Sequence, residues 1–351
     1  MATLTTTSLA NEYQKYFTKQ LLQHAVQLTV MDQFALKQPL PAKKGAKTIS
    51  FFRRSKSAVV ANGAGAGRVA NVQTLTEGTP VNTYVNHTLD RIDVTLQQYG
   101  EVSKVTDLLG MTELFDALKQ NISLMSEDCA VEADSITRDA LVDATGGGVS
   151  LQQASGSGTE RISTLYAQGL SNFTALSAAT PSAGKATATD FLRAATQLKL
   201  NRAPTFNGYY IAVVPPQIAH DLQNDIDWVD ASNAGDPERR FRGELSSYAG
   251  IKFVEHTNPF LEDGTGTEGT FATATLASDR IYRTFIVGQG AYGVPSFGGE
   301  SPYNPQIIIA DGADKSDPLN QYMTAGWKAY WAASALNCPN AISLSTKTEF
   351  V

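Results

Sequence analysis

Alternating apolar and polar positions dominate residues 47–109 and predict a long extended hairpin with a glycine-rich tip. The alternation is clearest in two runs, Val81–Val85 and Ile92–Leu96. A period of two with β-branched residues is typical of half-buried strands, and residues 98–105 continue the pattern. A two-stranded ribbon with little core of its own is marginal in water. We therefore expect an arm that packs against a neighbouring subunit.

The next apolar positions have helical spacing and predict one long helix over residues 112–144. The apolar stripe comprises Leu114, Phe115, Leu118, Ile122, Met125, Cys129, Ile136 and Ala140. Thr112 is the predicted N-cap, and the run from Gly146 to Gly148 is a strong stop. At ~1.5 Å per residue the helix would span about 50 Å, far more than an average globular helix. We interpret it as a strut with an acidic second face, formed by Glu127, Asp128, Glu132, Asp134 and Asp139.

The remaining patterns predict a mixture of helices and strands. Residues 9–36 have apolar residues at helical spacing, and two prolines, Pro39 and Pro41, end that helix. Residues 145–185 are rich in Gly, Ser, Ala and Thr, so we expect irregular connections with one or two short strands. Beyond them, a helix, a buried strand and a second helix predict an α/β layer at 188–200, 209–214 and 217–225. Further strands are expected at 251–255, 280–288, 307–310, 327–335 and 341–346.

A basic stretch accompanies the first strand of the hairpin. It comprises Lys43, Lys44, Lys47, Arg53, Arg54 and Lys56. Two interpretations are open: charges that protect a solvated strand edge, or a positive surface that meets acidic residues of a neighbouring copy. The candidate inter-subunit contacts, in the basic strand, the tip and the acidic helix face, are Arg53, Arg54, Lys56, Gly63, Gly65, Gly67, Arg68, Glu127, Asp128 and Glu132.

The glycines of the tip predict a flexible turn and not a phosphate site. Gly63, Gly65 and Gly67 tolerate positive φ. In a dinucleotide-binding fingerprint the third glycine would fall at Arg68, and no helix follows directly.

Composition and charge narrow the class of protein. The 351 residues suggest two domains, or one domain with large excursions. A net charge of -6 lacks the basic footprint of a dedicated nucleic-acid binder. The first residues do not have the pattern of a signal peptide, and no run of about 18 apolar residues predicts a membrane helix. Cys129 and Cys338 are expected to be buried free thiols.

Residues for catalysis or metal binding are not grouped along the sequence. The four histidines are His24, His87, His220 and His256, and none has a second ligand at metal-site spacing. There is no Gly-x-Ser-x-Gly elbow and no Walker A loop. The acids between Asp221 and Asp230 do not match a calcium-binding loop. We therefore expect no catalytic residue, no metal and no cofactor, and a protein that is not an enzyme.

Several short stretches, in a particular order and spacing, carry a family resemblance. They are Leu75–Pro80, Gln97–Val102 with Asp107–Leu109, Pro204–Tyr210 running into Pro215 and Asp221–Leu222, Phe241–Leu245, Asp317–Asn320, and Gly326–Lys328. Together with the hairpin and the long helix they resemble a tailed-bacteriophage major capsid protein. That family has an α+β fold with an N-terminal arm, an extended β-hairpin loop, a long spine helix, a peripheral domain and an axial domain.

The resemblance implies a division of the chain and a structural function. The N-terminal arm would be residues 1–45, the extended loop 46–90, the peripheral domain 91–184 plus 306–351 with the spine helix at 112–144, and the axial domain 185–305. Many copies would form hexamers and pentamers and close an icosahedral shell around packaged double-stranded DNA, without sequence-specific binding. The implied partners are other copies, a portal, and scaffolding or cementing proteins, with no membrane. The implied locations are the virion and, during assembly, the host cytoplasm.

Three other functions stay open at this point. An encapsulin-like nanocompartment shares the fold and encloses an enzyme cargo. A soluble α/β enzyme would place its site near Trp228 and His256 and form a small oligomer. A phage tail-tube protein would also use a long hairpin, although the long helix argues against it because tube subunits resemble small β-sandwiches.

Overall fold

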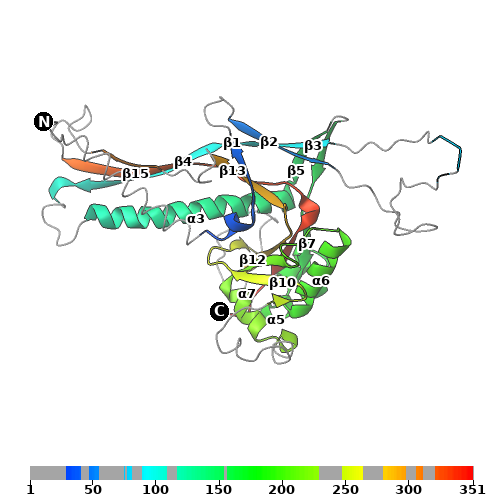
Figure 1. Ribbon diagram of the computed structural model, residues 1–351. Helices are drawn as coiled ribbons and strands as arrows, with labels where there is room; N and C mark the ends of the chain where they lie inside the picture. The colour runs from blue at the N-terminus through cyan, green and yellow to red at the C-terminus, as the bar shows by residue number, and fades with distance from the viewer. Residues whose placement is uncertain are drawn as a thin grey trace.

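The molecule has an elongated upper part and a compact domain beneath it (Figure 1). The computed structural model describes residues 29–40, 47–54, 75, 77–80, 89–108, 117–153, 156–228, 247–263, 280–297, 306–310 and 321–350. Helix α3 (Ala117–Gly146) runs along the elongated part and ends beside the compact domain. It is therefore one of the elements that join the two parts.

Helix α3 is the long helix that the apolar spacing predicts. Its 30 residues span ~45 Å. Ile122, Met125 and Cys129 are buried as expected, whereas the predicted N-cap and the first stripe positions lie outside the described residues. The helix ends at Gly146, two residues later than predicted, because the next two amide groups both donate to the Asp143 carbonyl. Gly148 adopts φ +79°, a conformation that favours glycine at a helix end.

A three-stranded antiparallel sheet lies against the first half of α3. Its order is β14 (Gln306–Ala310), β15 (Tyr322–Trp331) and β4 (Gln97–Thr106). The shared core consists of Ile122, Met125, Cys129, Ile307, Ala325, Trp327 and Ala329. The two longer strands approach closely at Gly100, where a Cβ atom would lie 2.7 Å from the Trp327 carbonyl oxygen. This position therefore requires glycine.

The root of the predicted hairpin is a second sheet. Strand β2 (Thr48–Arg54) pairs antiparallel with β3 (Leu89–Thr95) along its whole length. The hairpin β5 (Val149–Gln153) and β6 (Gly156–Glu160) extends this sheet beside β3. Even-numbered residues of β3 are buried and odd-numbered ones exposed, which confirms the predicted alternation. The tip and the run Val81–Val85 lie outside the described residues.

The compact domain is built on a mixed seven-stranded sheet. Its order is β7 (Ser163–Tyr166), β17 (Ala341–Thr346), β12 (Arg280–Val287), β8 (Tyr210–Val214), β10 (Ile251–Glu255) and β9 (Ser247–Tyr248), and β11 (Phe260–Asp263) pairs with β12. Helices α6 (Ala188–Leu200) and α7 (Pro216–Gln223) pack in the core on one face. The last turns of α3 pack on the other face. The predicted helix–strand–helix layer is confirmed.

The domain division that the resemblance implies stays a prediction, and one sheet takes strands from more than one of its ranges. Strands β7 and β17 come from ranges assigned to the peripheral domain, but they hydrogen-bond into the sheet formed by the range 185–305. Residues 145–185 are also more regular than predicted, because they contain three strands and the short helices α4 (Phe173–Ala178) and α5 (Pro181–Gly184).

The helix predicted for residues 9–36 is wrong over its described end. Residues Met31–Phe34 form a 3-10 turn, η1, and Leu36–Leu40 form strand β1. Strand β1 pairs in parallel with β13 (Tyr292–Phe297), which pairs in turn with β16 (Ser334–Ala335). Pairing with a distant strand outweighs the local helical spacing here. Residues 9–28 lie outside the described part of the chain.

Candidate assembly surfaces

Arg53 anchors the root of the hairpin within its own chain. Its guanidinium donates to Glu160 Oε2 at 2.6 Å and lies 3.2 Å from Asp90 Oδ2. It also donates to the Leu336 carbonyl at 2.9 Å and to Asn337 Oδ1 at 3.1 Å. Burial alone would lower the pKa of Arg53, but the bonds and charges of the two carboxylates raise it above its usual value. The side chain is therefore a permanent cation that joins β2, β3, β6 and the segment before β17.

The position of Arg53 follows from strand geometry. Ile49 and Phe51 are buried, and Arg53 is the next residue of the same parity. Its neighbour Arg54 has the opposite parity and is exposed. The two candidate arginines thus face different sides of β2, and this difference was available in the sequence alternation. Whether either contacts a neighbouring copy stays a prediction.

The exposed face of strands β2 and β3 at the hairpin root combines the cation Arg54 with exposed apolar side chains. Phe52 is 62% exposed and Leu89 is 49% exposed. Leu89 lies opposite Arg54 in the β2–β3 register. We call Phe52, Arg54 and Leu89 the arm-root patch.

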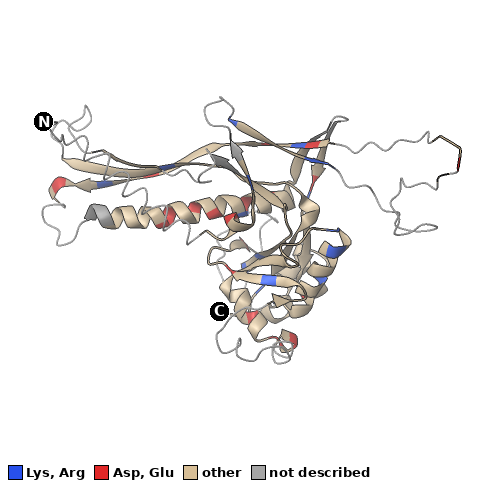
Figure 2. Ribbon diagram, viewed as in Figure 1, with Lys and Arg blue, Asp and Glu red and all other residues tan. Residues whose placement is uncertain are grey.

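The solvent face of α3 combines acids with exposed apolar side chains. Leu124 is 58% exposed and Val131 is 46% exposed, and the acids Glu127, Asp128 and Glu132 beside them are exposed. The spacing of these five residues places them on one side of the helix. Figure 2 shows the acidic positions along α3. We call these five residues the helix patch.

Two acids predicted for the same face behave differently. Asp139 is half-buried and pairs with Arg138 at 2.8 Å. Desolvation raises the pKa of Asp139, and Arg138 opposes this. Asp134 is buried and bonds to His256, so its assignment to the exposed face is wrong. At this point the helix is covered by the loop that holds His256 and by the Met31 amide, in addition to its apolar side.

Within the described part of one chain, no hydrogen bond or ion pair joins the arm-root patch to the helix patch. Their charges are opposite, and both present apolar side chains. The other candidate residues of the hairpin, Lys56, Gly63, Gly65, Gly67 and Arg68, lie outside the described residues.

The described residues do not form a metal site or a catalytic site that we can identify. They contain no group of three His, Cys, Asp or Glu side chains that could hold a metal, and none of their helices is long and apolar enough to cross a membrane. Trp228 packs in the helix-covered core with Phe253. His256 instead lines a gap with Val213 and Phe285, which belong to the core on the other face of the sheet. These two residues therefore do not share an enzyme site.

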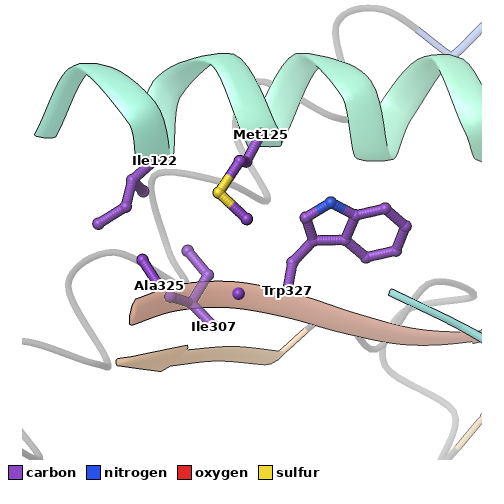
Figure 3. A pocket seen from close by; sticks show the side chains of 6 residues that line it. Ile122, Met125, Ile307, Ala325 and Trp327 are labelled. Atoms are coloured by element: carbon purple, nitrogen blue, oxygen red, sulfur yellow. The ribbon is translucent and has the colours of Figure 1, made fainter. Parts of the chain in front are cut away.

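An apolar seam without room for a water molecule lies between α3 and the three-stranded sheet (Figure 3). It is lined by Ile122, Met125, Ile307, Ala325, Gly326 and Trp327. The indole Nε1 donates to Glu101 Oε2 at 3.2 Å. The lining offers no convergent polar groups to orient a ligand, so we interpret the seam as part of the core between α3 and the sheet and not as a binding site.

Comparisons with solved structures assign the fold. The chain is similar to "Capsid structure of the Cyanophage P-SCSP1u", with TM-score 0.62 and 16% identity over 92% of this chain and 89% of that chain. It is also similar to "Capsid of Ralstonia phage GP4", with TM-score 0.58 and 14% identity over 90% and 87%. A third match is "Cyanophage Pam1 capsid asymmetric unit", with TM-score 0.56 and 15% identity over 90% and 89%.

The chain has the phage capsid fold. This confirms the α+β capsid fold that the resemblance predicts. No protein-family model and no curated protein matches the chain. The phage capsid fold is thus evident from the arrangement of the elements, and the three matched chains share 16% or less of their residues with this chain. The matched structures are those of phages, which does not favour the nanocompartment alternative.

Proposed function

We propose that this chain is the major capsid protein of a tailed phage. Many copies assemble as hexamers and pentamers into an icosahedral shell that encloses packaged double-stranded DNA. The role is structural, without an enzymatic step. The observation that carries the proposal is the phage capsid fold, which extends over about nine tenths of this chain and of the chains that it matches.

The shape of the subunit supports assembly. The core shared by α3 and the three-stranded sheet and the core at the hairpin root are separate and small, and they lie in the elongated part of the molecule (Figure 1). Each copy therefore has several separate surfaces, and contacts repeated around a rotation axis close into rings. Individual contacts can be weak because each subunit makes several at once.

The net negative charge of the chain supports a shell that encloses DNA without binding it tightly. A net charge of -6 and an acidic helix patch do not provide the dense phosphate contacts of a DNA-binding protein. DNA would be enclosed without sequence-specific binding. The proposed location is the virion, and the host cytoplasm during assembly. The proposed partners besides other copies are a portal and scaffolding or cementing proteins.

Electron microscopy of the purified chain, with sedimentation velocity on the same sample, tests the proposal. Closed shells, or separate hexamers and pentamers, are expected. A uniform dimer or tetramer under all conditions, including added crowding agent, would refute a shell-forming function. A shell that copurifies with a specific enzyme and excludes DNA would instead indicate a nanocompartment.

We further propose that the arm-root patch of one copy contacts the helix patch of a neighbour. The two patches have opposite charge, and each adds two exposed apolar side chains to the contact. Arg54 is the informative residue, because Arg53 is already engaged within its own chain.

A charge-swap experiment tests this contact. Arg54→Glu should impair assembly, and the triple reversal of Glu127, Asp128 and Glu132 to Lys should do the same. Combining both sets should restore assembly, and the restored shells should be sensitive to salt. Failure of the combination to improve on either set alone would rule out this pairing of surfaces while leaving the shell function untouched.

A further inference from the structure

The side of the three-stranded sheet that faces away from α3 presents exposed apolar side chains. Successive side chains of a strand point to opposite faces. Ile307 and Trp327 pack towards α3 (Figure 3), so the even-numbered residues of β14 and β15 are on the outer side. Val102 of β4 and Ile308 of β14 are 71% and 51% exposed there. Both lie opposite Gly326 in the register of the sheet, so the three residues form one row across it.

The middle of this row has no side chain. A Cβ atom at Gly326 would lie 2.9 Å from the Glu101 carbonyl oxygen and 3.1 Å from Val102 Cγ2. Such distances are shorter than ordinary van der Waals contacts, so the position favours glycine. The backbone of β15 therefore stays uncovered between Val102 and Ile308, and one side chain of a partner can contact both of them together.

Two lysines flank the row and give the outer side a positive charge. Lys104 Nζ lies 3.2 Å from the centre of the Tyr322 ring, and Lys328 Nζ lies 5.4 Å from that of Tyr330. Cation–π attraction of this kind keeps both ammonium groups close to the sheet. We call Val102, Lys104, Ile308 and Lys328 the sheet patch. None of the remaining outer positions of the three strands is acidic; they are Gln98, Gly100, Thr106, Gln306, Ala310 and Thr324.

The charge of the sheet patch excludes two simple ways of covering it. Two copies would not bring their sheet patches together, because like charges would face each other. A nucleic acid would place phosphates against the apolar row, and two cations are few compared with the contacts of a DNA-binding surface. An interface with an apolar centre and a polar rim is instead typical of contacts between proteins. The chemistry that fits is an acidic protein segment with an apolar side chain at its centre.

We propose that the sheet patch binds an acidic segment of a different protein. An apolar side chain of that segment lies on the row between Val102 and Ile308, and its carboxylates lie beside Lys104 and Lys328. The helix patch of another copy has similar chemistry; that the occupant is a different protein rests on the proposed function, in which the helix patch contacts the arm-root patch. A single contact of this size is weak, and repetition over many copies strengthens the binding of a partner with several such segments.

Fluorescence anisotropy of a dye-labelled random copolymer of glutamate and tyrosine, mixed with the full-length protein, tests the proposal. The copolymer supplies carboxylates and large apolar side chains, whereas labelled polyglutamate supplies only the charge. We expect the copolymer to bind at least about tenfold more tightly than polyglutamate, because the row buries an apolar side chain. A labelled DNA duplex should bind more weakly than the copolymer.

Two variants identify the surface that binds. Val102→Ser should weaken copolymer binding by about tenfold and leave polyglutamate binding unchanged. Lys104→Glu with Lys328→Glu should weaken the binding of both polymers by about tenfold, since each attraction is replaced by a repulsion. Lys199→Glu with Lys252→Glu is the matched control, because it reverses two exposed lysines of the compact domain. The control changes the net charge equally and should bind both polymers as the wild type does.

Four binding results would overturn the proposal. They are a copolymer that does not bind, equal binding of copolymer and polyglutamate, equal losses in the two double reversals, and tighter binding of DNA that Val102→Ser does not weaken. The last result would make the sheet patch a nucleic-acid surface.

Shell assembly separates this inference from the proposed function. The protein with Lys104→Glu and Lys328→Glu should still form shells, because its altered surface is reserved for another protein. Failure of this variant alone to assemble would make the sheet patch a contact between copies and refute a different protein as its occupant. If the wild type itself forms no shells, the proposed function fails, while the binding measurements still decide whether the sheet patch takes an acidic segment.

Discussion

Replacing Arg53 with alanine is expected to loosen the hairpin root selectively. The substitution removes the cation shared by Asp90 and Glu160 and the bonds to Leu336 and Asn337. Asp90 is 2% exposed, so it would be left as a buried carboxylate without its partner. Breaking a buried ion pair costs about 3–5 kcal/mol. The side chains of Arg53 and Glu160 are 20% and 26% exposed. Solvent screens the charges there, which reduces the cost of breaking this ion pair.

We therefore expect the opening free energy of the root to fall by about 2–3 kcal/mol. Hydrogen exchange of peptides spanning 48–54 and 89–95 measures that opening. The expected acceleration is about 30- to 150-fold, at ~1.4 kcal/mol for each factor of ten. Peptides from α6 and β8, which belong to another core, should be unaffected.

Arg54→Ala is the matched control. It removes the same charge from the adjacent residue, but its side chain is on the exposed face of β2. In the unassembled subunit, exchange at the root should change by less than about threefold, as is usual for surface substitutions. Equal effects of the two substitutions would refute the assignment of Arg53 as an internal anchor. Arg53→Lys keeps the charge but loses the fork of donors, so it should fall between the two.

Three further predictions concern the core, the thiols and the tip. Arg283→Met should destabilise the protein by about 3–5 kcal/mol in thermal or urea unfolding, because Glu262 stays buried without its cation; adding Glu262→Leu should recover most of the loss, and no recovery would contradict the charge explanation. Burial raises the pKa of Cys129 and Cys338 to about 12, so a thiol reagent at pH ~8 should label them only after denaturation, and rapid native labelling would disprove their burial. Deleting residues 61–68 should leave the circular dichroism spectrum intact but impair shell closure; loss of the spectrum would show that the tip belongs to the core.

The sequence predicted those elements whose environment is set locally. The strand β3 has one buried and one exposed face, so its alternation gave both the element and its burial. Helix α6 begins at Thr187, where a reciprocal capping box with Asp190 matches the predicted boundary. The all-buried strand β8 and the glycine stop after α3 were recognisable for similar reasons.

The errors occur where distant segments decide the environment. Residues Leu36–Leu40 form a strand because β13 pairs with them, and their own spacing does not show this. Asp134 has the helical position of a surface acid, but the loop at His256 and the Met31 amide cover that side of α3. The partners of Arg53 are up to 284 residues away. Local periodicity identifies a face but not what covers it.

The place of β17 in the sheet has a consequence for synthesis. This strand pairs with β12 on one side and β7 on the other, and Ile342 and Leu344 have no exposed surface. All the other strands of that sheet precede it in the chain. During translation the sheet therefore has an open slot between β7 and β12 until residues 341–346 have been made. A copy truncated before them lacks a complete core, so the sheet itself distinguishes chains that contain residues 341–346 from chains that lack them.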